Sequence, residues 1–372
     1  MNPVRVGVIG CGSISDIYLT NMIHTFSTTE VVACSAKHIE SAQKKAAQYG
    51  IRACTTEELL TDPEIELVVV LTPTPTHYGL VRQALLAGKH VYTEKTIAET
   101  FDQARELLSL ANEKDLRLGV APETFLGSAL QTARRAIDDG MPGDISSFHV
   151  VANRDLNLLA SIFKFLLLPG GGIAYDYGVY YLTALVSLLG PIAKVYADVG
   201  NRKKIRTDIY PMSPDFGKEY VYDNEAQVNA ILTTESGITG TFSLNGDSVL
   251  QDQAYFTIHG SKGILKCTNA DHFGDDVQFL ANHPRGAEWV SLPPVRNFRE
   301  NSRGVGPADM ARCIREGGEH AASKEMGCHV LDVIEQMIES GRTGLPLRPR
   351  TSCKRPAPFE GDALLAENET EH

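Results

Sequence analysis

The first 120 residues alternate between short apolar runs and amphipathic segments. Apolar runs that predict buried β-strands lie at 4–9, 30–34, 67–71 and 90–92. Residues 39–49 predict a helix, and residues 74–87 predict another with Thr74 as its N-cap and Pro75 at its first position. Strands that alternate with helices through short loops indicate a parallel sheet, so we expect an N-terminal Rossmann domain over residues 1–121.

The pattern changes in the second half of the chain, where polar and apolar residues alternate with a period of two. Strands are predicted at 193–199, 225–234, 239–245, 254–259 and 263–268. Helices are predicted at 128–139, 173–190, 308–316 and 323–340. We therefore expect an α/β protein in which the Rossmann domain is followed by a C-terminal α+β domain over 122–345. This second domain is expected to hold a large, mainly antiparallel open sheet, and residues 346–372 to form an arm and tail.

A glycine-rich loop follows the first predicted strand. The sequence from Gly10 to Ser15 has the spacing G-x-G-x-x-S. In dinucleotide-binding folds the first glycine permits a tight turn, the second lets the backbone approach a pyrophosphate, and the third position takes a small residue. Free N–H groups at the start of the next helix then bind phosphate. Residues predicted to bind the pyrophosphate of NAD or NADP are Gly10, Gly12, Ser13 and Ile14.

The end of the second predicted strand bears on the choice of cofactor. NAD enzymes usually place Asp or Glu there to bind the ribose 2′-hydroxyl. Residues 34–38 read Cys-Ser-Ala-Lys-His and contain no carboxylate. Ser35 and Lys37 are suited to a 2′-phosphate, which favours NADP. The alternative is that Lys37 is an ordinary solvated lysine.

The composition argues against several classes of protein. The chain has 372 residues, of which 43% are hydrophobic, enough for two packed domains. A net charge of −11 disfavours nucleic-acid and anionic-membrane partners, and no apolar run approaches the ~20 residues of a membrane span. Seven scattered cysteines and no visible signal peptide lead us to expect reduced thiols in a cytoplasmic protein. Asp155, Asp176 and the histidines lack metal-ligand spacing, so no metal is predicted.

Six short motifs occur along the chain. They are V-G-V-I-G-C-G at 6–12, T-P-T-P-T-H at 72–77, A-G-K-H-V at 87–91, E-K at 94–95, G-G-G-x-x-x-D-x-G at 170–178 and H-V-L-D at 329–332. In this order they resemble the Gfo/Idh/MocA family, the glucose–fructose oxidoreductase and inositol dehydrogenase group, over nearly the whole chain. The resemblance implies an NAD(P)-dependent oxidoreductase. It also implies a C-terminal domain that binds substrate and forms a homo-oligomer, a dimer or larger, through its sheet.

The resemblance assigns positions beside the cofactor. In the family the lysine of E-K lies at the nicotinamide edge, next to the reacting carbon. Lys95 matches that lysine, and Glu94 matches the acidic residue at the cofactor. Thr96 stands where the family usually has proline, and we expect the turn to survive this change. The T-P-x-x-x-H motif implies further contacts from Thr72, Pro73, Thr74 and His77.

The predicted helix after Gly170 carries a carboxylate and several phenols. Asp176 and Tyr180 are four residues apart and project from one helix face. Many family members have D-x-x-x-H here, with histidine as acid and base. Tyrosine occurs in branches that resemble glucose–fructose oxidoreductase and dihydrodiol dehydrogenase. Tyr175, Tyr177 and Tyr181 are expected to be core aromatics with paired hydroxyls.

Lys95, Asp176 and Tyr180 are therefore the predicted catalytic residues. A phenol has a pKa near ~10 in water, and a nearby ammonium lowers that pKa. Lys95 is the candidate ammonium for Tyr180. The alternative, which the sequence leaves open, is that Lys95 itself carries the proton.

These features predict an enzyme that moves hydride between nicotinamide and a secondary hydroxyl of a sugar, a glycoside or a cyclitol. Tyrosines near the site offer a platform for an aglycone, so oxidation of a glycoside at ring C3 is one specific hypothesis. Alternatives are a reductase of an aldehyde or ketone, a dihydrodiol dehydrogenase, and a nucleotide-sensing protein without turnover. Residues 153–155 either contact a polyol or form a solvated loop.

Overall fold

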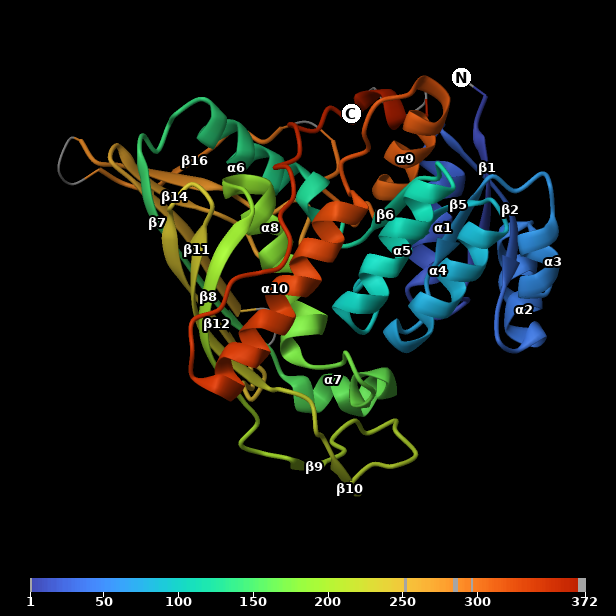
Figure 1. Cartoon of the computed structure of the whole chain (residues 1–372), viewed down its shortest axis with the longest axis horizontal. Helices are drawn as coiled ribbons and strands as arrows, with labels where there is room; N and C mark the ends of the chain where they lie inside the picture. The colour runs from blue at the N-terminus through green and yellow to red at the C-terminus, as the bar shows by residue number, and fades with distance from the viewer. Residues whose placement is uncertain (1, 251–252, 284–286, 296, 367–372) are drawn as a thin grey trace. The chain divides into compact units, whose positions relative to one another are not determined.

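The computed structural model describes residues 2–250, 253–283, 287–295 and 297–366, which form two compact units. Within those limits the first unit comprises residues 2–126, 300–328 and 359–366, and the second comprises 127–299 and 329–358. Figure 1 traces the chain from blue at the N-terminus to red at the C-terminus.

The first unit is built on a six-stranded parallel sheet. Its strands are β1 (Val4–Ile9), β2 (Thr29–Ser35), β3 (Arg52–Ala53), β4 (Leu67–Val70), β5 (His90–Thr93) and β6 (Leu118–Val120). Its α-helices are α1 (Ser15–His24), α2 (Ile39–Tyr49), α3 (Thr56–Thr61), α4 (His77–Leu86), α5 (Phe101–Glu113) and α9 (Val305–Glu316), and its 3₁₀ turns are η1 (Thr74–Thr76), η2 (Thr124–Leu126) and η5 (Asp362–Leu364).

The strand order is β3-β2-β1-β4-β5-β6, which confirms the expected Rossmann domain. All four residues of β4 are buried, as expected for an inner strand covered on both faces. Strand order reverses between β1 and β4. Ligands of open parallel sheets bind outside the carboxyl ends of the strands at such a point.

The helix expected from Thr74 begins later than predicted. Residues Thr74–Thr76 form the 3₁₀ turn η1 with Pro73 as its N-cap, and α4 starts at His77. Thr76 donates its hydroxyl hydrogen bond either to Thr72 Oγ1 (2.7 Å) or to Pro73 O (2.8 Å), so it is tied to the preceding loop. The tighter turn holds residues 72–76 at the end of β4.

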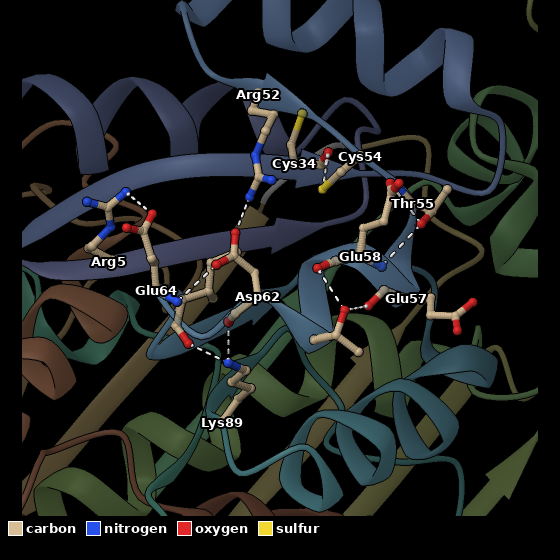
Figure 2. A network of polar contacts seen from close by, with 12 residues as sticks. Arg5, Cys34, Arg52, Cys54, Thr55, Glu57, Glu58, Asp62, Glu64 and Lys89 are labelled. Carbon is tan, nitrogen blue, oxygen red and sulfur yellow. Dashed lines mark hydrogen bonds and ion pairs between the residues drawn. The ribbon is translucent and has the colours of Figure 1, made fainter.

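Local hydrogen bonds shape the chain between β3 and β4 (Figure 2). Thr55 and Glu58 form a capping box at the start of α3: Thr55 Oγ1 accepts from Glu58 N (3.2 Å), and Glu58 Oε2 accepts from Thr55 N (2.8 Å). Lys89 donates to the carbonyls of Asp62 (2.6 Å) and Ile65 (2.8 Å). These bonds fix the entry into β4 and, with it, the centre of the sheet.

Residues 300–328 fold with the first unit, so the division of the chain differs from the expected domain of 122–345. The Glu123 carboxylate caps α9, because it accepts hydrogen bonds from the N–H groups of Gly304 and Gly306. Tyr92 of β5 donates to the same carboxylate (2.8 Å). A carboxylate at a helix N-terminus is favourable electrostatically, and here it joins α9 to the parallel sheet.

The expected arm is also divided between the units. Residues 359–366 belong to the first unit, where Ser27 N donates to Leu364 O (2.8 Å). The preceding part of the arm belongs to the second unit, where Leu347 and Val195 form an isolated antiparallel bridge. Backbone hydrogen bonds therefore tie down both parts of this segment.

The second unit is built on an eight-stranded sheet. Its strands are β7 (Ile145–Asn153), β8 (Ile192–Gly200), β11 (Gln227–Thr234), β12 (Thr239–Asn245), β13 (Gln253–Gly260), β14 (Gly263–Lys266), β15 (Gln278–Ala281) and β16 (Val290–Ser291). Its other elements are α6 (Ser128–Asp138), α7 (Leu156–Ile162), η3 (Lys164–Leu167), η4 (Ala174–Gly178), α8 (Val179–Leu189) and the ribbon of β9 (Ile205–Thr207) and β10 (Glu219–Val221). Helix α10 (Lys324–Thr343) begins in the first unit's residues and continues into the second.

The sheet order is β16-β15-β14-β13-β7-β12-β11-β8. The only parallel pair in this sheet's described strands is β7–β12, so the mainly antiparallel sheet is confirmed. Two helices pack on one face: a Cβ at Gly178 would lie 2.7 Å from Leu244 of β12, and Ala197 N of β8 donates to Ser340 Oγ of α10 (3.0 Å). All eleven residues of α8 are buried.

The other face of this sheet has exposed apolar side chains. Val151, Tyr196, Ile231 and Tyr255 on β7, β8, β11 and β13 are 39%, 48%, 48% and 49% exposed. Burial along β11 and β12 alternates residue by residue, as expected for a sheet with one covered face. None of the helices in the described ranges has the length and apolar character needed to cross a membrane.

Candidate functional site

The glycine-rich loop of the first unit has the geometry of a pyrophosphate cradle. Gly10 has φ +111°, and a Cβ there would lie 2.8 Å from the backbone of Leu71, so only glycine fits. A Cβ at Gly12 would meet nothing within 4 Å, which leaves the backbone open on that side. Ser13 is exposed, and Ser15 is buried at the start of α1. These residues fit the pyrophosphate of NAD(P), with α1 presenting its N-terminus beside Ile14.

The two residues expected at a 2′-phosphate differ in exposure. Ser35 is fully buried, its hydroxyl lies 3.2 Å from Thr56 Oγ1, and its carbonyl accepts from Gly10 N (2.9 Å). Its side chain therefore lies against α3. Lys37 is exposed at the start of the following loop. Of the two, Lys37 is the side chain accessible to a ligand.

His77 joins the loops after β4 and β5. Its Nε2 lies 2.6 Å from Thr72 O, and its Nδ1 lies 2.6 Å from Thr96 O. Burial lowers the pKa of His77, while the two carbonyl contacts oppose that shift. Thr74 Oγ1 also donates to Lys95 O (3.5 Å), and the Lys95–Thr96 peptide bond is cis. The predicted cofactor residues of these two loops are thus brought together, and His77 is a buried bridge between them.

Glu94 connects the Lys95 loop to helix α1. Tyr18 of α1 donates to Glu94 Oε1 (2.8 Å), and Lys95 N donates to Glu94 Oε2 (3.0 Å). Burial, followed by the charges of Glu123 and Glu94, raises the pKa of Tyr18 well above its usual range. The helix after the glycine loop and the predicted catalytic lysine therefore share one buried carboxylate. Nothing in the local sequence around Tyr18 predicts this bond.

In the second unit the predicted catalytic helix starts with a π-helical turn, η4, before α8 begins at Val179. Such widened turns are rare and often lie at functional sites. Asp176 lies inside the turn and Tyr180 just beyond it, and they are 8% and 7% exposed. The structure thus places both predicted residues in the buried start of this helix.

The glycines before the helix make room for protein groups. A Cβ at Gly171 would lie 2.3 Å from Leu166 O, and a Cβ at Gly172 would lie 2.0 Å from the carboxylate of Glu225. That carboxylate accepts from Ala174 N (3.0 Å) and caps the helix. Burial raises the pKa of Glu225 to about 7. Sequence reasoning missed Glu225, which is 51 residues from the amide that it binds.

The hydroxyls of two further tyrosines are paired inside the unit. Tyr181 OH donates to Asn269 Oδ1 (2.8 Å), and Tyr177 OH lies 3.4 Å from the same oxygen. Both side chains are fully buried, as expected for core aromatics, so they offer no platform for an aglycone. Burial, followed by Glu225, raises the pKa of Tyr175 above its usual range.

Residues 153–155 have separate structural partners. Asn153 donates to Gln253 Oε1 (3.0 Å), and Asp155 caps α7 by accepting from Leu158 N (3.0 Å). Arg154 lies 3.6 Å from Asp176 Oδ2 through Nη1 and 3.4 Å from Asp271 Oδ2 through Nη2. Its guanidinium carbon lies 4.2 Å from the centre of the Tyr177 ring. Of the three residues, Arg154 is the one in contact with a predicted catalytic side chain.

Within the described residues, no group of three or more His, Cys, Asp or Glu side chains is arranged to hold a metal ion.

Family comparisons match two segments of the chain. Residues 4–121 match the oxidoreductase family with an NAD-binding Rossmann fold, Gfo/Idh/MocA, and residues 130–266 match the Gfo/Idh/MocA C-terminal domain.

Curated relatives agree with this match. An uncharacterized oxidoreductase of Schizosaccharomyces pombe is 31% identical over 213 residues, which cover 55% of this chain and 57% of that protein. The scyllo-inositol 2-dehydrogenase (NADP(+)) of Bacillus subtilis is 23% identical over 356 residues, which cover 92% of this chain and 95% of that protein. Levoglucosan dehydrogenase, solved with NADH and L-sorbose, shares the fold with a TM-score of 0.81 at 18% identity; the match covers 94% of this chain and 99% of that one.

The Glu225 cap predicts a pH dependence of stability. The pKa of Glu225 in the folded protein, about 7, lies above its ordinary value of 4.5, so the folded chain binds this proton more tightly than the unfolded chain. The contribution of this group to the free energy of unfolding is therefore greatest below pH 4.5 and is lost as pH rises to about 7. For Glu225→Gln we expect a flatter profile than wild type between these limits, by on the order of 1 to 3 kcal/mol.

Urea unfolding at a series of pH values measures this difference. Glu219→Gln, at an exposed glutamate of β10, is the matched control and should keep the wild-type slope. A Glu225→Gln profile parallel to that of wild type would show that this carboxyl does not titrate differently on folding.

Proposed function

Because the chain belongs to the Gfo/Idh/MocA family of NAD(P)-dependent oxidoreductases, we propose that it transfers hydride between nicotinamide and a secondary hydroxyl of a sugar, glycoside or cyclitol. The observation that carries this proposal is the buried pair of Asp176 and Tyr180 at the π-helical start of one helix. A carboxylate and a phenol one helical turn apart supply a hydrogen-bond acceptor and a group that can exchange a proton, which are the functions that oxidation of a polyol hydroxyl needs.

Three side chains have roles in the proposed chemistry. Bound NAD(P) supplies the nicotinamide carbon that accepts or gives the hydride. Tyr180, as the phenolate, takes the hydroxyl proton at its phenolic oxygen during oxidation and, as the phenol, returns it during reduction. Asp176 accepts a hydrogen bond from a substrate hydroxyl and orients the reacting carbon. From the family resemblance we propose that Lys95 supplies an ammonium that stabilises the developing alkoxide.

A glycoside oxidised at ring C3 is the specific substrate that we favour. Two exposed rings, Phe163 and Phe165, precede the glycines of the catalytic segment and have their centres 6.0 Å apart. Exposed aromatic rings are suited to pack against an aglycone or a sugar face. The named substrates of two similar proteins, scyllo-inositol and levoglucosan, support the wider class of polyols.

NADP is the proposed physiological cofactor. Its support is the absence of a carboxylate after β2 together with the exposed position of Lys37. A homo-oligomer formed through the open face of the eight-stranded sheet is proposed on the strength of its exposed Val151, Tyr196, Ile231 and Tyr255.

Removing the phenol or the ammonium should impair turnover. For Tyr180→Phe and Lys95→Ala we expect kcat to fall well over tenfold, because proton transfer loses its group or its charge. Cofactor affinity of Tyr180→Phe should be unchanged, as measured by NAD(P)H fluorescence titration. Tyr210→Phe, in the segment between β9 and β10, is the matched control. Wild-type assays with free sugars, inositols and aryl glycosides identify the substrate class, and activity on non-sugar carbonyls alone would contradict the proposed function.

Lys37 should determine the preference for the phosphorylated cofactor. In Lys37→Glu we expect KM for NADP to rise at least tenfold, while KM for NAD changes little, because a carboxylate repels the 2′-phosphate and accepts from the 2′-hydroxyl. Lys44→Glu, at an exposed lysine of α2, controls for net charge. A clear wild-type preference for NAD in steady-state kinetics would refute the proposed cofactor.

Charge placed on the open sheet face should dissociate the oligomer. Ile231→Glu buries a carboxylate in the proposed interface, so the mass from light scattering at micromolar concentration should fall to that of one chain. Ile205→Glu places the same change on the β9–β10 ribbon and should leave the mass unchanged. A wild-type protein that is monomeric in this measurement would remove the interface from consideration.

A further inference from the structure

Arg154 occupies a central position at the end of the middle strand of the large sheet. It directly follows β7, which lies between β13 and β12, and its N–H donates to Asn245 O (2.9 Å). Its side chain is 15% exposed. Arginine is seldom buried unless its charge is compensated, so the surroundings of this guanidinium require an explanation.

Those surroundings hold the guanidinium between two carboxylates and a ring. Asp176 lies 3.6 Å away on one side, Asp271 lies 3.4 Å away on another, and the face of Tyr177 lies against its carbon at 4.2 Å. Burial alone would lower the pKa of Arg154, but Asp176 and Asp271 outweigh it and raise the pKa above its usual range. The charge is therefore permanent and stacked on an aromatic face.

A chain of hydrogen bonds supports these partners from behind. Asn269 Oδ1 accepts from Tyr181 OH (2.8 Å) and from Asp271 N (3.1 Å), and the hydroxyl oxygens of Tyr177 and Tyr181 lie 3.0 Å apart. Tyr181 and Asn269 thus hold the Tyr177 ring and the Asp271 loop, both of which flank Arg154. A guanidinium fixed in this way can orient another group with little loss of entropy.

We infer that Arg154 is a positioning residue of the reaction: its guanidinium holds the Asp176 carboxylate through a buried ion pair and supplies a fixed positive charge to the start of the helix that carries Tyr180. This role deepens the proposed function and rests on it. Arg154 acts through Asp176 and Tyr180 and is assigned no contact with the reacting atoms. The charge would favour the ionised forms of both groups, the carboxylate that accepts the hydrogen bond of the substrate and the phenolate that accepts the hydroxyl proton.

Other titratable groups of the second unit also bear on this pair. The groups whose charges interact with Asp176 or with Arg154 include Asp271, Tyr177, Tyr180, Tyr181 and Tyr222. Of these, Asp271 is the carboxylate that competes with Asp176 for Arg154. Removing Arg154 and removing Asp271 should therefore have opposite effects on the ionisation of Asp176 and Tyr180.

The pH dependence of kcat for polyol oxidation tests this pair of opposite effects. In Arg154→Gln we expect the acid limb to move up by about one to three pH units, because both groups lose a cation. In Asp271→Asn we expect it to move down, since more of the guanidinium charge then acts on Asp176 and Tyr180. Arg154→Lys keeps the charge and should recover at least half of the Arg154→Gln shift. A merely structural arginine would lower kcat in Arg154→Gln without moving the limb.

A second measurement needs no turnover. The absorbance of phenolate is followed during alkaline titration, and the signal of Tyr180 is taken as the difference between each protein and its Tyr180→Phe form. Its midpoint should rise in Arg154→Gln and fall in Asp271→Asn. Unchanged midpoints, or shifts in the same direction, would overturn the role of Arg154. Expected midpoint shifts in a protein inactive on every polyol would instead show that the proposed substrate class is wrong and the electrostatic role correct.

Discussion

Burial of the Asp176 carboxylate is the constraint on which the arrangement of the second unit depends. Removing a charge of this kind from water costs several kcal/mol unless a partner compensates it. Arg154 provides that partner and in turn needs Asp271 and the face of Tyr177. Compensation of the Asp176 charge therefore involves the helical turn, the end of β7 and the loop after β14. These segments are far apart in sequence and are joined by the compensation of charge.

The first unit buries carboxylates with a different kind of partner. Glu94 and Glu123 accept hydrogen bonds from the phenols of Tyr18 and Tyr92, both at 2.8 Å. A phenol is neutral and compensates less than a guanidinium, and burial accordingly raises the pKa of Glu123 to about 7. Such a carboxyl joins segments through hydrogen bonds, as Glu123 does between β5 and α9. The cation beside Asp176 is suited to a group that must stay ionised.

Periodicity was sufficient to predict most of the longer strands, the parallel sheet of the Rossmann domain and the mainly antiparallel sheet, because burial on one or both faces of a sheet sets the local pattern of apolar residues. It did not predict the short strands β3, β6, β9, β10, β15 and β16. It could not predict the π-helical turn at Ala174–Gly178, whose residues satisfy a helical pattern equally well. Contacts of long sequence separation were also beyond it. The cap of α9 joins residues 181 positions apart, and no motif marks either end. Such contacts follow only once the sheets have brought distant segments together.

If Tyr180 carries the hydroxyl proton, as we propose, the sign of the neighbouring charge bears on the identity of residue 180. The family resemblance implies histidine at this position in many members, and an added cation lowers the pKa of either side chain. For an imidazole with an ordinary pKa near ~6.5, that shift weakens a base already suited to neutral pH. For a phenol near ~10, the same shift brings the pKa toward neutrality. A guanidinium paired with Asp176 therefore suits Tyr180 and would impair a histidine in its place. Under the proposed roles, tyrosine at 180 therefore depends on arginine at 154.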